Sequence, residues 1–588
     1  MTFRAPVDEI VFTMRHVAGL DAAVAEGLYG DLGTDLVRSI LEEAGRFATD
    51  VIAPIDRTGD LEGAVLREGA VAMPPAFREA YRAWAQAGWN ALPGPPDYGG
   101  QGLPALVNAA CLEMWNGASM AFGVGPMLTY GAVEAMAAHA SPELKERYLH
   151  KLVSGEWMGT MNLTEPQAGS DLGALRARAE PAGDGTYRIR GQKIFITYGE
   201  HDLTDNIVHL VLARLPDAPP GSRGISLFLV PKFLPDGSRN DVRCHSVEHK
   251  LGIHASPTCT MIYGDAGGAV GWLVGEENRG LACMFTMMNN ERLAVGLQGV
   301  GIAERARQRA LAYARERRQG RAPGWSGEGM SPIVAHPDVQ RMLMTMGALT
   351  AAARGICYAT AAAIDRAELA QDPEARRAAH ERASLLTPVA KAFSSDIGVE
   401  VASLGVQVHG GMGYVEETGA AQHLRDARIN TIYEGTNGIQ AIDLVTRKLP
   451  LSGGETVRRE IAGMRAVLQR VVKEATPAFG RTGARLREGI ESLDRATSFM
   501  LKALAGNRPE AALAGATPYL RLFALAQGAT ALAQAALAVP AEQDPAQASR
   551  IATCRFFAEN VAVGAGGLEE TVIRGGGFVE DAQAALAG

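Results

Sequence analysis

Hydrophobic and polar residues along the first part of the chain follow the spacing of helices. In residues 36–44 (LVRSILEEA), apolar positions recur three and four apart, which places them on one face of a helix. Residues 93–102 (PGPPDYGGQG) are rich in proline and glycine and predict a loop between helices. Residues 1–157 are therefore predicted to form an N-terminal α-helical domain.

The pattern changes to that of strands over residues 158–278. The segment TYRIRGQKIFITYG carries β-branched and aromatic residues on both sides of Gly191-Gln192, which we interpret as a turn. Two short apolar runs, NIVHLVLARL and GISLFLVPK, follow and are bounded by Asp, Pro and Gly. This region predicts a central antiparallel β-domain.

Long helical patterns return in residues 279–450, with NNERLAVGLQGVGIAERARQRALAYARERRQG the clearest. The segment PLSGG at 450–454 marks a boundary, and residues 451–588 are rich in alanine and again helical in pattern. Within this extension, one helical face is predicted to consist of Ile461, Met464, Val467, Leu468 and Val471. Helices, then a sheet, then two helical regions predict an α+β fold that is mostly α, because a doubly wound α/β fold alternates strands with helices.

Size, composition and charge argue against several classes of function. A chain of 588 residues is too long for one core, and 47% hydrophobic with 21% charged residues is typical of a globular protein. The net charge of -8 argues against nucleic acid or an anionic membrane as the main partner. The six cysteines form no CxxC pair, and we expect free thiols rather than a zinc site. His245, His249 and His254 lack an acid-rich frame, so no metal site is predicted. We also expect neither a signal peptide nor a membrane span.

A single glutamate, Glu434, is surrounded by turn formers in the segment NTIYEGTNGIQ, just before a run with a helical pattern. A carboxylate in such a loop is a candidate general base, since it is movable and has free backbone N–H groups beside it. The alternative is a glutamate favoured only by the helix dipole.

Two further motifs lie in the strand region. MNLTEPQAGSDLGA, residues 161–174, places hydroxyls and glycine after an apolar run, so a ligand could approach the backbone closely. KIFITYG follows some thirty residues later. Alone, the first motif is equally well explained as a surface loop. The second is better explained as a half-buried strand end, because an aromatic residue in a strand usually belongs to the core.

Taken together and in this order, the motifs resemble the acyl-CoA dehydrogenase family. LTEPQAGSD, KIFIT, QVHGGMGYVEE and RDARINTIYEGTNGIQ have the order and spacing of that family, and the resemblance covers residues 30–450. The N-terminal RAPVDEIVFTM and the long tail resemble a bacterial subgroup of longer chains that includes 3-methylmercaptopropionyl-CoA dehydrogenases. The resemblance implies a helical domain, a β-domain and a four-helix-bundle domain, here with an extra C-terminal helical domain.

The family resemblance implies a flavoenzyme that oxidises an acyl-CoA thioester to a trans-2-enoyl-CoA. FAD takes the hydride from Cβ, and a carboxylate, here Glu434, takes the α-proton. An α-proton beside a thioester is weakly acidic, so donors must also polarise the carbonyl oxygen. The base must be desolvated so that its pKa rises toward the working range.

The resemblance also implies a set of contacts, carried over position by position. The implied FAD-binding residues are Met161, Leu163, Thr164, Gly169, Ser170, Phe195, Ile196, Thr197, Arg317, Gln407, Val408, Gly410, Gly411, Thr436 and Asn437. The implied substrate-binding residues are Ser170, Arg292, Glu434 and Gly435. Arg317 matches an arginine that reaches FAD across a subunit interface.

A second acid, Glu291, precedes Arg292 in MMNNERLAVG. Some members of the family keep their base at this position. Two carboxylates in one pocket would push their pKa values apart, and we favour Glu434 as the base. Glu291 could instead pair with Arg292 or cap a helix.

The resulting expectation is a cytoplasmic acyl-CoA dehydrogenase of β-oxidation-type fatty acid metabolism that passes electrons to an electron-transferring flavoprotein. The alternatives are an acyl-CoA oxidase that uses O₂ and a non-catalytic acyl-CoA-binding protein. Because the tail of longer members covers the surface that shorter ones use to pair dimers, a homodimer is expected. The acyl group is left open between methylmercaptopropionyl and fatty acyl chains.

Overall fold

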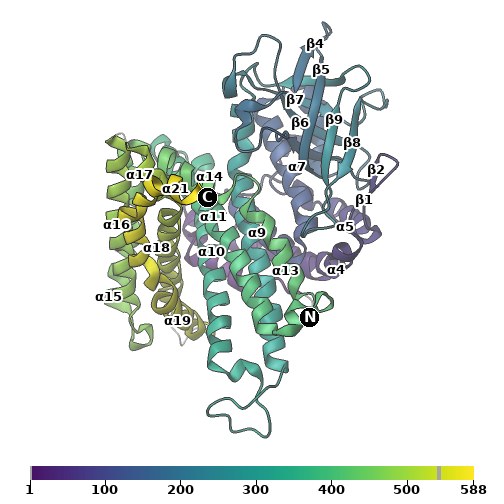
Figure 1. Ribbon diagram of the computed structural model, residues 1–588. Coiled ribbons are helices and arrows are strands. Elements are labelled where there is room, and N and C mark those ends of the chain that lie inside the picture. Colours follow the sequence, from purple (N-terminus) through teal and green to yellow (C-terminus); the bar gives the residue numbers. More distant parts are fainter. Residues whose placement is uncertain (1–2, 507, 540–543, 588) are drawn as a thin grey trace.

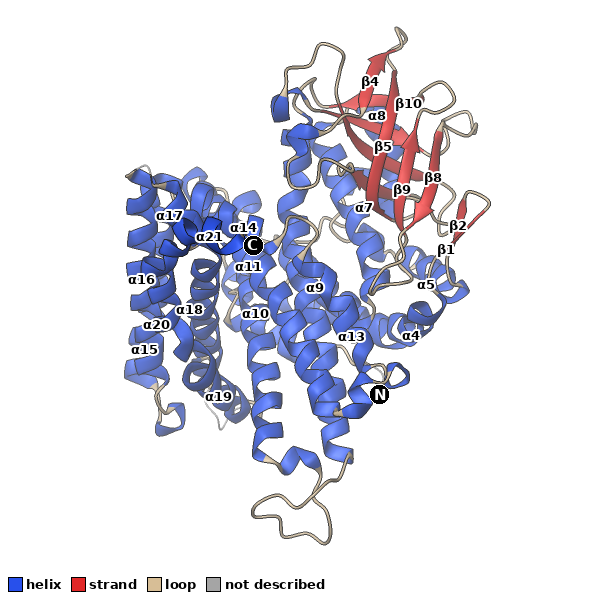
Figure 2. Cartoon of the chain, viewed as in Figure 1, coloured by secondary structure: helices blue, strands red, loops and turns tan. Residues whose placement is uncertain are grey.

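The computed structural model describes residues 3–506, 508–539 and 544–587. Figure 1 shows the β-domain above a central set of long helices, with the C-terminal helices packed along one side. Figure 2 shows that strands are concentrated in this one domain and that helices make up the rest of the molecule. The fold is therefore α+β and mostly α, as predicted from the order of the patterns.

The N-terminal region is mainly helical, and two of its later helices, α6 and α7, are buried on nearly all sides. Almost every residue of α6 and α7 is buried, which explains why these segments are apolar all round rather than amphipathic. The predicted loop at 93–102 is present, and Gly100 is needed there because a Cβ would lie 2.0 Å from the carbonyl oxygen of Gly94. The elements are α1 (Val7–His16), α2 (Leu20–Ala25), α3 (Thr34–Phe47), α4 (Ala53–Glu62), β1 (Val65–Arg67), β2 (Ala70–Ala72), α5 (Pro75–Gln86), α6 (Ala105–Ala118), α7 (Met120–His139) and α8 (Pro142–Ser154).

The β-domain is one sheet with strand order β3-β6-β7-β10-β5-β9-β8, and β4 pairs with β5. All pairs are antiparallel except β3 with β6, which are parallel because the chain returns through β4 and β5 before it reaches β6. The strands are β3 (Met158–Asn162), β4 (Arg178–Pro181), β5 (Tyr187–Thr197), β6 (Ile207–Ala213), β7 (Ser226–Pro231), β8 (Val242–Val247), β9 (Thr258–Tyr263) and β10 (Ala269–Val274).

The turn expected at Gly191-Gln192 is wrong, because β5 runs through it without a break. The first half of β5 pairs with β4 and β10, and the second half pairs with β9. Gly191 has φ +146°, and a Cβ there would lie 2.9 Å from Ala177. The glycine therefore allows a close approach of two strands rather than a reversal of the chain.

Three long helices form the centre of the molecule. They pack against one another and against α6, and α13 covers α9 and α11. The elements are α9 (Gly280–Glu316), α10 (Pro337–Leu369), α11 (Pro373–His409), α12 (Gly411–Tyr414), α13 (Ala420–Ala427) and α14 (Asn437–Asp443).

The C-terminal extension packs on this bundle mainly through α18, which contacts α10. The five apolar residues predicted on one face of α15 are all buried, as expected. The helices α10 and α18 are long and apolar enough to cross a membrane, but most of the apolar window of each is buried in the protein, as in core helices. The elements are α15 (Glu455–Glu474), α16 (Thr482–Ala505), α17 (Pro509–Ala514), α18 (Ala516–Leu537), α19 (Gln547–Phe556), α20 (Ala565–Arg574) and α21 (Phe578–Leu586).

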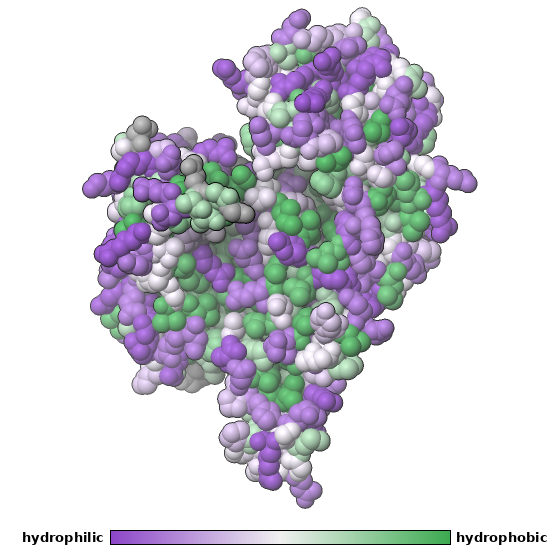
Figure 3. Space-filling view, viewed as in Figure 1, coloured by the Kyte–Doolittle hydropathy of each residue, from purple (hydrophilic) through white to green (hydrophobic). Residues whose placement is uncertain are grey.

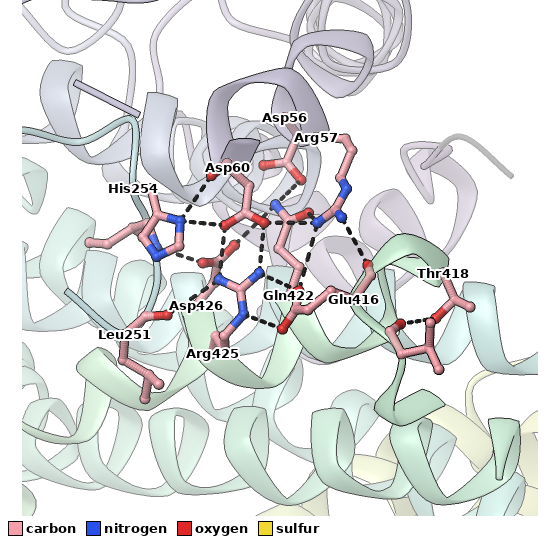
Figure 4. Close-up of polar contacts among 12 residues, drawn as sticks. Asp56, Arg57, Asp60, Leu251, His254, Glu416, Thr418, Gln422, Arg425 and Asp426 are labelled. Atoms are coloured by element: carbon pink, nitrogen blue, oxygen red, sulfur yellow. Dashed lines mark hydrogen bonds and ion pairs between the residues drawn. The ribbon is translucent and has the colours of Figure 1, made fainter. Parts of the chain in front are cut away.

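A buried network of charged residues joins α13 to the N-terminal region and to the β-domain (Figure 4). Arg425 on α13 donates to both carboxylate oxygens of Asp60 on α4, at 2.8 and 2.6 Å. Next to it, Asp426 accepts from the backbone N–H of Ile253 at 2.6 Å. We call the set Asp56, Asp60, Gln422, Arg425 and Asp426 the interdomain network. It anchors α13 directly before the loop that carries Glu434.

Candidate active site

Glu434 lies in the short loop between the 3₁₀ turn Arg428–Thr431 and α14. Its φ of +54° is in the left-handed region, which a side chain other than glycine rarely adopts. Such a conformation costs about 1–3 kcal/mol and persists only where the surroundings impose it. Thr436 begins α14, and its hydroxyl accepts a hydrogen bond from Ile439 N–H at 3.3 Å. The loop therefore presents the acid in a strained but fixed position.

Lys391 on α11 holds this loop in place through hydrogen bonds. Its ammonium group donates to the carbonyl oxygen of Gly435 at 2.8 Å and to Asn437 Oδ1 at 2.9 Å. Burial lowers the pKa of Lys391 to about 8, although the charge of Glu434 opposes this shift. The side chain of Asn437 also donates to Asp396 at 2.7 Å, so its polar atoms are engaged with α11.

Glu434 and Glu134 each lie close enough to Glu291 to raise its pKa, and we call Glu134, Glu291 and Glu434 the acid cluster. Burial raises the pKa of Glu434 above its ordinary value, while Arg292 and Lys391 hold it down. Burial, followed by the charges of Glu434 and Glu134, raises the pKa of Glu291 well above its ordinary value. Burial also raises the pKa of Glu134 to about 8. Burial thus favours the protonated form at all three acids, and at Glu291 the charges of the other two add to this effect.

Glu291 has neither of the structural roles considered from the sequence. It lies inside α9 and so does not cap a helix, and within the described residues neither of its buried oxygens has a hydrogen-bond partner. Arg292 instead donates to Asp443 at 3.4 Å. The absence of a side chain at Gly131 makes room for the acid, because a Cβ there would lie 2.4 Å from Glu291 Oε1.

The two motifs of the β-domain lie side by side. The backbone N–H of Ile194 donates to the carbonyl oxygen of Thr164 at 2.9 Å. Lys193 donates to the carbonyl oxygen of Leu163 at 3.0 Å and to Glu165 at 2.8 Å, and both charged side chains are buried. This ion pair fixes the end of β3 against β5.

Phe195 is exposed at a bulge in β5. The pairing of β5 with β9 shifts register between Lys193 and Ile196, and Phe195 takes φ +60° with 58% of its surface exposed. A bulge re-aims a side chain, and here it turns an aromatic ring out of the sheet. The side chains of Met161 and Ile196 are buried in the core, Leu163, Thr164 and Thr197 are half-buried, and Gly169 and Ser170 are exposed.

The other implied cofactor residues lie far along the bundle. Gln407 follows Lys391 by sixteen residues on α11, which is about 24 Å along the helix axis. Arg317 ends α9, and the rings of Tyr313 and His409 stack at 4.4 Å, which brings the ends of α9 and α11 together. Val408 is buried there, while Gln407, Gly410 and Gly411 are exposed. Within one chain, this group is therefore separate from the acid cluster.

Three residues that position the site were missed in the sequence: Glu165, Lys193 and Lys391. Lys391 is a charged residue in an otherwise apolar or small-residue stretch, PVAKAFSS, whereas Glu165 and Lys193 stand among other polar residues that hide them. A lysine on the buried face of a long helix needs a specific partner, and this pattern was the available signal.

Comparison with known families and proteins places these features in context. Family models match along the chain: "Acyl-CoA dehydrogenase, N-terminal domain" at residues 34–156, "middle domain" at 160–266, "C-terminal domain" at 278–449 and "Acetyl-CoA dehydrogenase C-terminal like" at 460–582. A 3-methylmercaptopropionyl-CoA dehydrogenase of Ruegeria pomeroyi is 48% identical over 574 residues, covering 96% of each chain.

Two solved structures share the fold. ACDH-11 of Caenorhabditis elegans, in complex with C11-CoA, has a TM-score of 0.79 at 20% identity and covers 99% of this chain and 96% of its own. An acyl-CoA dehydrogenase of Bacillus anthracis complexed with FAD has a TM-score of 0.74 at 22% identity, covering 92% and 88%. At these identities the likeness concerns the fold.

Proposed function

Because the chain belongs to the acyl-CoA dehydrogenase family, we propose that it oxidises an acyl-CoA thioester between Cα and Cβ, with Glu434 as the base. The α-proton passes to the Glu434 carboxylate, a hydride leaves Cβ, and a trans-2-enoyl-CoA results. FAD, when bound, supplies the acceptor for that hydride. The observation that carries the proposal is the strained, half-buried Glu434 in a loop held by Lys391.

The surroundings of Glu434 suit proton abstraction. Burial moves its pKa toward that of an effective base, while Arg292 and Lys391 keep the ionised form accessible. The backbone N–H of Glu434 donates to no other described residue. This group is our candidate donor to the thioester carbonyl oxygen, on which charge develops as the proton leaves.

The β-domain offers a surface suited to a flavin. Phe195 projects from a strained bulge, and the backbone of Thr164 lies beside the same strand. An exposed aromatic ring beside hydroxyls and free backbone groups fits a planar heterocycle with polar edges. We propose that Thr164, Ser170, Phe195 and Thr197 contact FAD, as in the sequence-based assignment.

A second copy of the chain would complete the cofactor site. Arg317, Gln407, Gly410 and Gly411 are too far from Glu434 to share one cofactor with it in the same chain, so we propose a homodimer in which they reach the partner's FAD. In Figure 3, hydrophobic residues gather over the central helices while the outer edge of the β-domain is mainly hydrophilic. Met412 and Tyr414 are 49% and 87% exposed beside this group, as expected for a covered surface.

The substrate class follows from the relatives. The extensive similarity to a 3-methylmercaptopropionyl-CoA dehydrogenase makes that thioester our first candidate, with fatty acyl-CoA second. We further propose a cytoplasmic enzyme that delivers its electrons to an electron-transferring flavoprotein.

The test is an anaerobic titration of the purified protein with propionyl-, 3-methylmercaptopropionyl-, octanoyl- and palmitoyl-CoA. We expect one class to bleach the flavin absorbance. We expect Glu434→Gln to bind that thioester, but its flavin should be reduced about 10²–10⁴-fold more slowly. A colourless protein would overturn the proposal of FAD. Bleaching of Glu434→Gln at the wild-type rate would overturn the assignment of the base.

A further inference from the structure

A buried chain of hydrogen bonds begins at Tyr433, the residue directly before Glu434. The hydroxyl of Tyr433 donates to Gln298 Oε1 on α9, and Gln298 Nε2 donates to Asn116 Oδ1 on α6 at 3.1 Å. Asn116 in turn donates to the carbonyl oxygen of Leu112 at 2.9 Å. Gln298 and Asn116 are fully buried. We call Asn116, Gln298 and Tyr433 the polar floor.

The polar floor lies beyond the acid cluster, along the packed helices α7 and α9. Gln298 follows Glu291 by seven residues on α9, so both side chains lie on one face, about 10.5 Å apart along the axis. A Cβ at Gly131 of α7 would lie 2.4 Å from Glu291 Oε1. Two turns back on α7, a Cβ at Gly123 would lie 2.6 Å from Asn116 Oδ1. The helices therefore lie antiparallel, with the acids at one level and the floor at the next.

The start of α9 is the surface end of this arrangement. Phe285 and Thr286 are exposed there, whereas residues 291–304 of the same helix are all buried. The CoA part of a thioester is charged and must stay near the surface, because burying unpaired charges is costly. With the substrate's Cα at Glu434, the hydrocarbon therefore points inward along α9, toward the polar floor.

A second polar group lies at this inner end. Asn430, in the 3₁₀ turn before Glu434, is fully buried, and its Nδ2 donates to Met120 Sδ at 3.4 Å. Met120 begins α7, one turn before Gly123. The Oδ1 atom of Asn430 has no partner among the described residues. A hydrocarbon chain that reached this oxygen would leave it unpaired, at a cost of about 1–3 kcal/mol. The inner end is therefore unsuited to a long acyl chain.

We infer that the polar floor ends the acyl pocket directly beyond the base, and that the volume of Gln298 limits the substrate to short acyl chains, of the size of butyryl or 3-methylmercaptopropionyl. This inference rests on the proposed function, which places the substrate's Cα at Glu434. The bonds to Tyr433 and Asn116 hold the Gln298 side chain in place, so it does not swing aside for a longer chain. Gln298 is thus the specificity-determining residue.

The test compares butyryl-, 3-methylmercaptopropionyl-, octanoyl- and palmitoyl-CoA by stopped-flow bleaching of the flavin in the purified full-length holoenzyme. We expect kcat/KM for the two short thioesters to exceed that for octanoyl-CoA at least about tenfold, the size of effect that a misfit in an apolar pocket produces. Gln298→Ala should raise the octanoyl-to-butyryl ratio of kcat/KM at least about tenfold. Gln298→Leu fills a similar volume and should keep the wild-type ranking. Gln469→Ala, exposed on α15, is the control.

Binding to Glu434→Gln separates chain length from chemistry. Calorimetry of this variant measures the affinity for octanoyl-CoA without turnover, and adding Gln298→Ala should tighten that binding at least about tenfold. Flavin content and circular dichroism show whether Gln298→Ala is folded, and the wild-type panel tests the floor without any variant.

The outcomes distinguish this inference from the proposed function. If wild type reacted with octanoyl-CoA as fast as with butyryl-CoA, the floor would be overturned and the dehydrogenase would stand. An unchanged ranking in folded Gln298→Ala, or a Gln298→Leu enzyme that accepts octanoyl-CoA, would overturn the role of Gln298. A holoenzyme that no thioester bleaches would instead contradict the proposed function.

Discussion

The interdomain network and the acid cluster are both buried groups of carboxylates, but they differ in how their oxygens are satisfied. In the network, Arg425 binds Asp60 twice and Gln422 donates to Asp56 at 2.8 Å. In the acid cluster, both oxygens of Glu291 and one oxygen of Glu134 have no partner among the described residues. A native protein leaves buried polar groups unpaired rarely, and a functional site is one common reason. We therefore interpret the interdomain network as a structural connection between domains and the acid cluster as a candidate reactive site.

The largest expected effect comes from breaking the network. Arg425→Met removes the bidentate partner of Asp60 and leaves this acid with Arg57 and His254, so we expect a loss of about 1.5–3 kcal/mol in the free energy of unfolding. Urea denaturation followed by circular dichroism measures this loss. Arg428→Met, an exposed arginine three residues along the chain, should change stability by less than about 0.5 kcal/mol. Equal stability of the two variants would mean that the network does not tie the domains.

The network also predicts a dependence of stability on pH. Burial and then the charge of Asp56 raise the pKa of Asp426 to about 7, from an ordinary value of 3.8. Between these values the folded chain holds a proton that the unfolded chain has lost, so stability falls as pH rises, by up to about 1.4 kcal/mol per pH unit.

Asp426→Asn should flatten this dependence. The amide resembles the protonated acid and still accepts from Ile253 N–H, so wild type and variant should converge in stability as the pH falls toward 3.8 and diverge as it rises toward 7. Near pH 8 the variant should be the more stable. Thermal unfolding of both proteins from pH 5 to 8 measures this difference. If the stability of the variant fell with pH as steeply as that of wild type, a group other than Asp426 would hold the proton.

The two regions also differ in what the sequence could predict. Periodicity predicted the mostly helical fold with a central β-domain and the buried face of α15, because these depend on local spacing of apolar residues. Glu434 was found because a family motif carries it. The network was not found, since Asp60, Ile253 and Arg425 are far apart in sequence and meet only through the packing of three domains.

The errors have local physical causes. Gly191 was interpreted as a turn because glycine permits a reversal, whereas the fold uses it for a close approach to Ala177. The apolar run around Lys391 predicted a helix correctly but not the partner of its charge, which lies 44 residues away at Gly435. Long-range hydrogen bonds of this kind are set by tertiary structure.

Lys391→Met tests whether the hydrogen bonds of this lysine position the loop that carries Glu434. Loss of the bonds to Gly435 and Asn437 frees the strained loop, and we expect kcat to fall about 10–100-fold, since small misplacements of a catalytic group have effects of this size. Loss of the positive charge should also raise the pKa of Glu434, so the activity profile should shift to higher pH. Lys473→Met, on the exposed side of α15, is the control. A lower kcat with an unshifted pH profile would mean that Lys391 holds the loop but does not set the pKa of Glu434.

The smallest effect is expected from Glu291→Gln. Burial and the charge of Glu434 raise the pKa of Glu291 well above its ordinary value, which favours the protonated form, and an amide resembles that form in charge and size. We therefore expect kcat/KM at pH 7 to stay within about threefold of wild type, against a loss of about 10²–10⁴-fold for Glu434→Gln. Stopped-flow bleaching of the flavin compares the two variants directly. The reverse order of effects would make Glu291 the base and leave Glu434 as the neighbour that sets its pKa.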